Sequence, residues 1–192
     1  LIIIFLLGII GTFYFQINKR KEEIKITHIT EKVFFTDKYD KNTSLCLPAA
    51  YTNKDGSIQG EYMIDGVSYG TPVRKERVSI HPTKGLIVSG QWHSKNGFQQ
   101  SVLVKNGKVR KFKDARKRVR RALCCDDSNK LYIIESTYRM TLAQFAELAS
   151  QHCRTVVNLD TGCYGYGWYD GHKCHCWAFY NKHKQTNWIC CE

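Results

Sequence analysis

The sequence predicts an α+β fold: a central mixed, mainly antiparallel β-sheet with flanking helices, preceded by an N-terminal membrane segment. Three observations support this prediction. Short apolar runs alternate with turn pairs through the middle of the chain, as in β-hairpins. One later segment has apolar residues at helical spacing, and the first residues form a nearly uninterrupted apolar run.

Length and composition limit the class of protein. The chain has 192 residues, which is enough for one well-buried core and too few for two full domains of usual size. Its content of 43% hydrophobic residues and three prolines excludes a largely disordered or collagen-like chain. The formal net charge of +12 favours anionic partners, such as phosphate groups, nucleic acid, anionic lipid or acidic glycans.

Residues 1–18 are interpreted as a membrane anchor or signal segment, 19–31 as a polar stalk and 32–192 as the folded domain. The apolar run is just under the roughly 20 residues that span a bilayer. No small-x-small cleavage site follows it, which favours an uncleaved anchor. The charges of Lys19, Arg20 and Lys21 argue for a cytoplasmic domain by the positive-inside rule. A buried core helix is the remaining alternative for the apolar run.

The cysteine content bears on the compartment. Nine cysteines are many for a reduced cytosolic protein of this size, and they favour a membrane-anchored domain outside the cytoplasm, periplasmic or on the cell surface. Cys124, Cys125 and Cys153 lie inside apolar segments and are predicted to be buried thiols. The cysteines near the C-terminus are better disulfide candidates.

Most of the domain is predicted to be β-structure. Turn pairs that predict hairpins occur at Asp55-Gly56, Asp65-Gly66, Lys84-Gly85, Asn96-Gly97, Asn106-Gly107 and Asp127-Ser128-Asn129. Strands are expected at 61–64, 67–69, 78–80, 86–89, 101–105, 108–112, 121–125, 131–135 and 155–159, and 33–35 leads into a first strand.

One helix is predicted from Thr141 to about His152, because Thr141 and Gln144 have capping-box spacing and an apolar stripe follows. With the strands on either side, it forms a strand–helix–strand unit, which usually makes its two strands parallel. Side chains at the carboxyl ends of such strands commonly line ligand sites. We therefore expect Glu135 and Asp160 at one rim of the sheet.

Two further features point to ligands less specifically. The basic stretch at 105–121 is interpreted as a solvated hairpin with a charged loop. It lacks interleaved aromatic residues, so nucleic acid is not an expected partner, and an anionic polymer substrate is the milder inference. His172, Cys174, His175 and Cys176 lie too close together for the usual C-x2-C zinc knuckle, so neither a metal nor another cofactor is predicted.

Several segments follow one another in the order and spacing of motifs from a known family. They are Pro48-Ala49-Ala50-Tyr51, Asp55-Gly56, Tyr62-Met63-Ile64-Asp65-Gly66, Arg121-Ala122-Leu123-Cys124, Leu131-Tyr132-Ile133-Ile134-Glu135, Met140-Thr141-Leu142-Ala143-Gln144-Phe145-Ala146-Glu147-Leu148 and Val157-Asn158-Leu159-Asp160. In these segments the chain resembles the phosphodiester glycosidases. The resemblance implies a glycosidase-like hydrolase acting on a sugar-1-phosphodiester of the N-acetylglucosamine type, or on a related surface glycan linkage.

The loop after Asp160 departs from that family's pattern. Where the family reads Asn-Leu-Asp-Gly-Gly-Gly-Ser-Ser, the chain reads Asn158-Leu159-Asp160-Thr161-Gly162-Cys163-Tyr164-Gly165. Thr161 and Gly162 are the predicted substrate-binding residues of this loop. Because the loop lacks the flexible glycines and both serines, a catalytically inactive glycan-binding surface protein of the same fold is the alternative function. A third hypothesis is an intracellular membrane-tethered protein that binds lipid or nucleic acid.

The residue types suit cleavage of a sugar C1–O–phosphate bond, which needs a carboxylate near C1 and cations on the phosphate. Asp160 is the predicted general base or stabiliser of the oxocarbenium-like transition state, and Asn158 is predicted to bind sugar hydroxyls. Arg121 is assigned to the phosphate, and Glu135 to a supporting acid or orienting role. Alternatively, Asp160 caps the loop after its strand and Arg121 pairs with an acidic residue.

Overall fold

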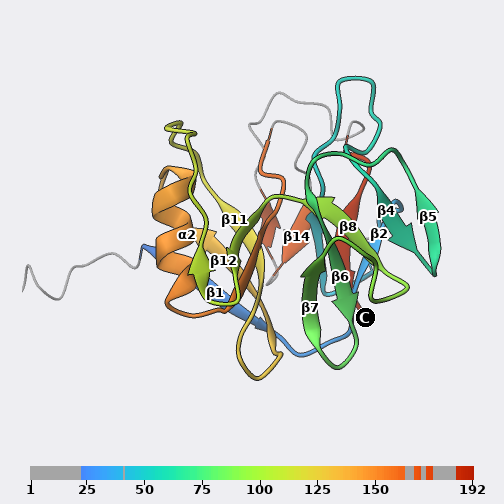
Figure 1. Ribbon diagram of the computed structural model, residues 1–192, viewed down its shortest axis with the longest axis horizontal. Helices are drawn as coiled ribbons and strands as arrows, with labels where there is room; N and C mark the ends of the chain where they lie inside the picture. The colour runs from blue at the N-terminus through green and yellow to red at the C-terminus, as the bar shows by residue number, and fades with distance from the viewer. Residues whose placement is uncertain (1–22, 41, 163–166, 170–171, 175–184) are drawn as a thin grey trace, which may run out of the picture.

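The computed structural model describes residues 23–40, 42–162, 167–169, 172–174 and 185–192. Within these ranges the chain forms sixteen β-strands and one α-helix (Figure 1). Each pairing between described strands is antiparallel. The predicted α+β class with a mixed sheet and flanking helices is therefore wrong. The physical reason is that short apolar runs separated by tight turns fold back on one another, and a single described segment carries a helical stripe.

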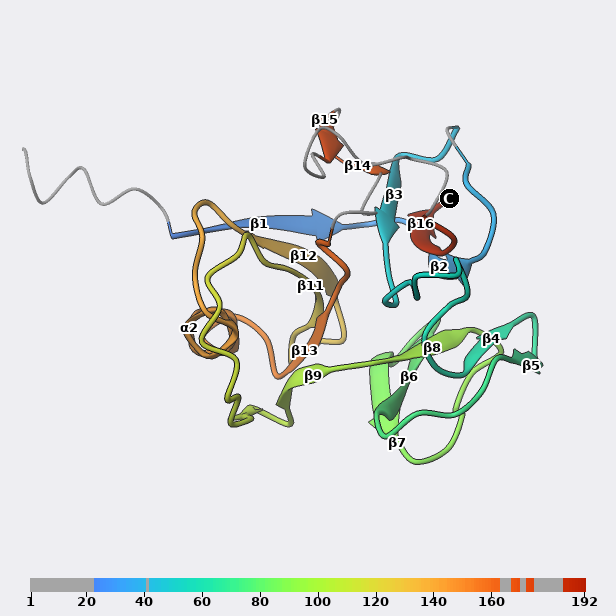
Figure 2. The same cartoon turned by 90° about the horizontal axis from the view of Figure 1, so that it is seen from above.

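The strands form three sheets (Figure 2). The six-stranded sheet has the order β1 (Ile24–Ile29), β12 (Leu131–Ser136), β11 (Arg121–Cys125), β13 (Thr155–Asn158), β9 (Val102–Lys105) and β10 (Lys108–Val109). One five-stranded sheet has the order β15 (His172–Cys174), β14 (Gly167–Tyr169), β3 (Leu45–Pro48), β16 (Trp188–Cys191) and β2 (Val33–Thr36). The other has the order β5 (Val67–Tyr69), β4 (Tyr62–Ile64), β8 (Gly97–Gln100), β6 (Glu76–His81) and β7 (Gly85–Ser89).

The strand–helix–strand unit is present, but its two strands do not pair. Strand β11 lies between β12 and β13 and is antiparallel to both. Strands β12 and β13 therefore run in the same direction without sharing hydrogen bonds. The expected parallel direction of the two strands is therefore present, but they are not neighbours, because a third strand, supplied by the preceding hairpin, lies between them.

Two of the predicted hairpin turns have the backbone that their residues favour. The β4–β5 turn has φ values of 52° at Asp65 and 85° at Gly66, and the β9–β10 turn has 50° at Asn106 and 73° at Gly107. Two successive positive φ values are typical of the type I′ turn, which matches the twist of antiparallel strands. Gly97 is different: it begins β8, where a Cβ would lie 2.3 Å from the Val78 carbonyl oxygen.

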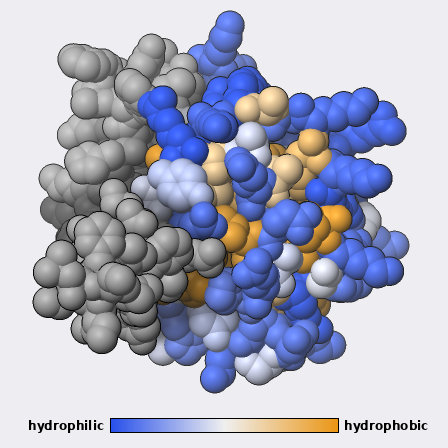
Figure 3. Space-filling view, turned by 90° about the vertical axis from the view of Figure 1, so that its left-hand side faces the viewer, coloured by the Kyte–Doolittle hydropathy of each residue, from blue (hydrophilic) through white to orange (hydrophobic). Residues whose placement is uncertain are grey.

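Helix α2 (Leu142–Ser150) begins with the predicted capping box of Thr141 and Gln144. It packs on one face of the six-stranded sheet, and the other two sheets lie toward the opposite face (Figure 2). The helix-side cluster contains Phe145, Ala146 and Ala149 together with Ala122 and Ile134 of the sheet. Figure 3 shows the side of the molecule that lies at the left of Figure 1, where hydrophilic side chains surround a smaller apolar area.

The main core lies where the three sheets face one another. Alternate residues of β11 separate the two clusters: Leu123 and Cys125 belong to the main core, whereas Ala122 and Cys124 face the helix. Strand β2 contributes Phe35, which stacks on Phe98 of β8 at a ring-centroid distance of 5.2 Å. The main core therefore joins all three sheets.

The folded part begins earlier than residue 32, the predicted boundary. Residues 24–29, expected in a polar stalk, form the edge strand β1, which pairs with β12 over its whole length. The expected membrane segment at 1–18 lies outside the described residues. Within the part of the chain that the structure describes, no helix has the length and apolar character needed to cross a bilayer.

Six cysteines whose side chains the structure describes are buried and carry no disulfide. Cys124, Cys125 and Cys153 are buried thiols, as the sequence predicts. Cys46, Cys190 and Cys191 are also buried and unlinked. Of the other predicted disulfide candidates, Cys163 and Cys176 lie outside the described residues.

Removing the central aromatic side chain of α2 tests how the helix is held on the sheet. Phe145 is completely buried, so Phe145→Ala is expected to lower the free energy of unfolding by about 3–5 kcal/mol. Denaturant titration followed by circular dichroism measures the change. The exposed Glu147 of the same helix provides the control, since Glu147→Ala is expected to change stability by less than about 0.5 kcal/mol. Equal effects of both substitutions would contradict the packing described here.

Candidate functional site

Four of the sequence-predicted site residues meet at one edge of the six-stranded sheet. Arg121 begins β11, Glu135 lies near the end of β12, and Asn158 ends β13. Because β11 is antiparallel to both neighbours, its start and their ends lie together. Asp160 follows two residues after β13. The structure thus places Glu135 and Asp160 at a common rim.

Asp160 is a buried carboxylate with well-defined partners. The residue as a whole is 5% exposed to solvent. Its amide donates to the Ala49 carbonyl at 3.0 Å, and its Oδ1 accepts from the Gly162 amide at 2.8 Å. Burial raises the pKa of the Asp160 carboxyl, while backbone hydrogen bonds from Gly162 and Thr52 oppose part of this rise. The bond to Gly162 means that Asp160 does cap the start of its loop.

Asn158, two residues before Asp160, contacts the segment that follows β3. Its Nδ2 donates to the Tyr51 hydroxyl oxygen at 2.9 Å and to the Leu159 carbonyl at 3.1 Å. Burial and the negative charge of Asp160 raise the pKa of the Tyr51 hydroxyl. Tyr51 therefore stays protonated and can donate its own hydrogen to a ligand oxygen.

Lys75 brings a cation to this cluster, and the sequence analysis missed it. Its Nζ lies 4.3 Å from the centre of the Tyr51 ring and donates to the side-chain oxygens of Gln59 at 2.8 Å and Gln100 at 3.3 Å. Burial lowers the pKa of Lys75 to about 8, and the charge of Asp160 opposes the shift. No motif marks this lysine: it precedes β6 in a polar segment with no pattern of its own.

Arg121 and Glu135 are paired with each other. They stand opposite in the β11–β12 register, and the Arg121 Nε and Nη2 atoms lie 3.3 and 3.1 Å from the two Glu135 carboxylate oxygens. The Arg121 side chain is 5% exposed, against 20% for Glu135. This two-point contact fits the interpretation in which Arg121 pairs with an acidic residue. It gives Glu135 an orienting role toward Arg121.

The basic stretch borders the same site. Arg120 is buried and donates to the carbonyls of Met140 and Arg116. The Thr161 hydroxyl donates to the Val119 carbonyl at 3.0 Å, which fastens the loop after β13 to the basic stretch. Burial raises the pKa of the Tyr51 hydroxyl, and the positive charges of Arg120 and Arg118 oppose part of this rise.

Asn187, also absent from the sequence predictions, holds the segment that carries Tyr51. It is fully buried, and its side-chain amide makes both possible bonds to the backbone of Ala50: Oδ1 accepts from the amide at 2.6 Å, and Nδ2 donates to the carbonyl at 3.1 Å. The backbone amide of Ala49 donates to the Asn187 carbonyl. Residues just before β16 therefore fix the position of Tyr51.

The described side chains form no group of three or more His, Cys, Asp or Glu residues placed to hold a metal ion. The His172 to Cys176 run considered in the sequence lies partly outside the described residues, and Gly162 is the last described residue before the gap at 163–166.

With the fold and the cluster defined, comparison with known proteins gives a likeness of architecture. The chain is similar to the zebrafish N-acetylglucosamine-1-phosphodiester alpha-N-acetylglucosaminidase catalytic domain, auto-inhibited by its pro-peptide, with a TM-score of 0.63 and 13% identity over 91% of this chain and 85% of that one. It is also similar to a hypothetical protein from Synechocystis, with a TM-score of 0.50 and 10% identity over 89% and 57% of the two chains. No family profile and no curated protein sequence matches. The chain therefore has a glycosidase-like fold.

The Arg121–Glu135 pair can be tested by removing one charge. Glu135→Gln leaves the buried guanidinium without its carboxylate and is expected to cost about 3 kcal/mol of unfolding free energy. In the double variant Arg121→Met, Glu135→Leu, most of this loss is expected to be recovered, because no charge is left unpaired. Equilibrium urea unfolding of the three proteins measures both effects. A double variant less stable than Glu135→Gln would show that the pair itself stabilises the sheet.

Proposed function

We propose that the chain is a glycosidase-like hydrolase that cleaves a sugar-1-phosphodiester, of the N-acetylglucosamine type or a related glycan linkage. The observation that carries the proposal is the meeting of a buried carboxylate, Asp160, with the cation of Lys75 and with the hydrogen-bonded pair of Asn158 and Tyr51. The likeness of fold to a glycosidase catalytic domain supports it.

The chemistry assigns Asp160 to the sugar carbon. When the C1–O bond breaks, positive charge develops on the sugar ring, and a nearby carboxylate stabilises it or removes a proton from the attacking water. The leaving group is a phosphate monoester, which needs little protonation. One well-placed carboxylate can therefore serve the reaction, and Glu135, bound to Arg121, has a positioning role.

Lys75 is assigned to the phosphate. Its charge, held in a partly buried site, opposes the negative charge that develops on the leaving phosphate. Arg121 belongs to the same rim, with two of its donors directed to Glu135. Asn158 and the Tyr51 hydroxyl have the donor and acceptor atoms that sugar hydroxyls require. The alternative function is a glycan-binding protein without turnover. The loop at Thr161 and Gly162 supports this alternative because it departs from the family pattern.

Replacing the carboxylate separates the two functions. Asp160→Asn preserves side-chain volume and an oxygen that can accept from the Gly162 amide, so the fold is expected to persist. For an enzyme, turnover of an N-acetylglucosamine-1-phosphodiester is expected to fall at least about 100-fold. Asp127→Asn, an exposed aspartate in the β11–β12 turn, is the matched control and is expected to keep full activity. A folded parent protein that binds the diester without releasing sugar would favour the binding protein instead.

The pH dependence of kcat/KM is expected to reflect the protonation of Lys75. Its protonated form binds phosphate, so kcat/KM is expected to fall as pH rises above about 8. In Lys75→Arg the cation persists at high pH, and this descending limb is expected to disappear. An unchanged limb in the Lys75→Arg profile would exclude Lys75 as its source.

The pH dependence of the unfolding free energy provides a second test of Lys75. Between pH 8 and about 10.4, the unfolded chain holds a proton on Lys75 that the folded chain has lost. The unfolding free energy of the parent is therefore expected to rise across this range relative to Lys75→Met. This comparison does not require activity, so it tests the burial of Lys75 even in a protein without turnover.

A further inference from the structure

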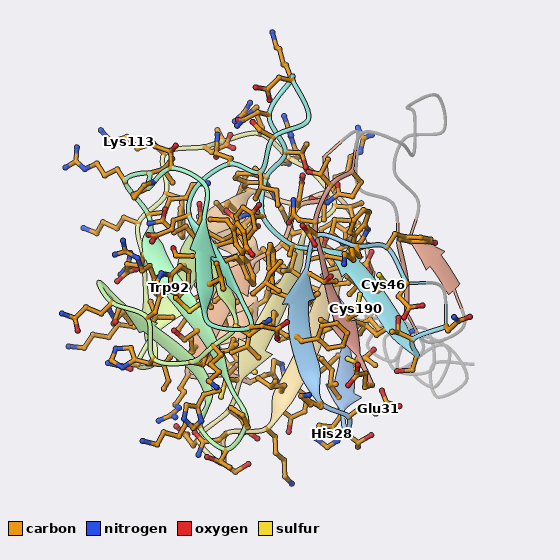
Figure 4. All side chains as sticks on the ribbon, turned by 90° about the vertical axis from the view of Figure 1, so that its right-hand side faces the viewer. His28, Glu31, Cys46, Trp92, Lys113 and Cys190 are labelled. Carbon is orange, nitrogen blue, oxygen red and sulfur yellow. The ribbon has the colours of Figure 1, made fainter. Side chains whose placement is uncertain are left out.

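Two cysteines far apart in the sequence face each other across neighbouring strands. Cys46 lies in β3 and Cys190 in β16, and they are direct partners in the antiparallel register. Both are completely buried, and their Sγ atoms lie 2.7 Å apart (Figure 4). Neither is linked in the structure. Cys190 is one of the C-terminal cysteines that the sequence analysis gives as disulfide candidates.

The backbone hydrogen bonds show which kind of strand pair this is. The Ala49 amide donates to the Asn187 carbonyl, so residues 49 and 187 form a hydrogen-bonded pair. Hydrogen-bonded and non-hydrogen-bonded pairs alternate along antiparallel strands, which makes Cys46 and Cys190 a non-hydrogen-bonded pair. Pro48, which has no N–H, occupies the other non-hydrogen-bonded position, opposite Trp188.

The opposite edge of β16 gives an independent check. Lys32 and Glu192 exchange two backbone hydrogen bonds between the β2 and β16 ends of the sheet. Hydrogen-bonded pairs recur every two residues, so Cys190, two residues before Glu192, forms a hydrogen-bonded pair with Phe34 of β2. Its N–H and C=O therefore point away from β3. In non-hydrogen-bonded pairs the side chains are closest, so the two Cβ atoms fall near the range of a disulfide without backbone movement.

The surroundings single out these two thiols. Cys46 and Cys190 form a small cluster with Trp188 and Phe34, on the face of the sheet turned away from the main core. Cys191, the next residue, belongs to the main core on the other face and points away from Cys46. The contact between the two thiols lowers the pKa of Cys46 and raises that of Cys190. Cys46 is thus the better nucleophile of the pair.

We propose that Cys46 and Cys190 are a redox site, at which the two strands are joined by a reversible disulfide when the protein meets a disulfide oxidant such as oxidised glutathione. Because both thiols are buried in the folded chain, the exchange takes place when the strands open locally. The Cys46 thiolate then attacks the oxidant, forms a mixed disulfide and releases one thiolate. Cys190 then loses its proton and attacks the Cys46 sulfur, and the second thiolate leaves. Two electrons pass to the oxidant, and the protein gives up two protons. This inference does not depend on the proposed hydrolase activity.

The position of the bond gives it a structural consequence. It closes a loop from residue 46 to residue 190, which removes much of the freedom of the unfolded chain. It also fixes β16 against β3 three residues from Asn187, which holds the backbone of Ala50 beside Tyr51. The oxidised form is therefore expected to be the more stable one, with the Tyr51 segment held more firmly.

The experiment compares the full chain after treatment with oxidised glutathione and after reduction with a phosphine. Following alkylation of free thiols and digestion without reductant, mass spectrometry is expected to find the Cys46 and Cys190 peptides joined in the oxidised sample. The oxidised protein is expected to melt about 5–10 °C higher than the reduced one.

Two cysteine variants test which residues form the disulfide. Cys190→Ala is expected to abolish both the joined peptide and the shift in melting temperature, whereas Cys191→Ala, at the neighbouring position on the other face, retains both. Alkylation of both Cys46 and Cys190 in the oxidised parent, or a bond from either one to a different cysteine, would overturn the proposal. The parent comparison decides the question even where a variant fails to fold.

Discussion

The hydrogen bond from the Asp160 amide to the Ala49 carbonyl joins the six-stranded sheet to the segment that continues β3, and the candidate site depends on it. It brings the end of β13 beside Tyr51, which Asn158 then contacts through its side chain. Asn187 holds the Ala50 backbone from the other side. The polar groups of the site are thus fixed where two sheets meet above a shared core, with rigid strands behind them rather than long loops.

Burial at this junction has opposite effects on the two charged groups. It raises the pKa of the Asp160 carboxyl and lowers that of the Lys75 ammonium, and the attraction between the two opposes both shifts. A carboxylate and a cation that are each poorly solvated respond strongly to a ligand that brings charge of the opposite sign. This property, more than the presence of any one residue, supports the proposal of a substrate with a sugar carbon on one side and a phosphate on the other.

Local patterns in the sequence predicted the local structure well and the long-range structure less well. The turns at Asp65-Gly66 and Asn106-Gly107 and the helix cap at Thr141 depend on nearby residues, so they could be read directly. The β12–β11–β13 order could not be predicted in this way, because nothing in the sequence of β12 or β13 indicates that β11 lies between them. Strand β1 was missed because its apolar residues do not share one face: Ile24 and Ile26 lie on one side and Ile29 on the other.

The same limit applies to the site. Asp160, Asn158, Arg121 and Glu135 were predicted from ordered motifs. The sequence did not show that Glu135 is the acidic partner of Arg121, and it did not indicate Lys75, which reaches Tyr51 through a contact across the fold. The proposed site is tested most directly by locating where a sugar phosphate binds. In an NMR titration of the full-length Asp160→Asn variant with N-acetylglucosamine 1-phosphate, we expect the largest amide shifts at Gly162 and Thr52. Shifts confined to other parts of the chain, or none at saturating ligand, would contradict a sugar-phosphate site at Asp160.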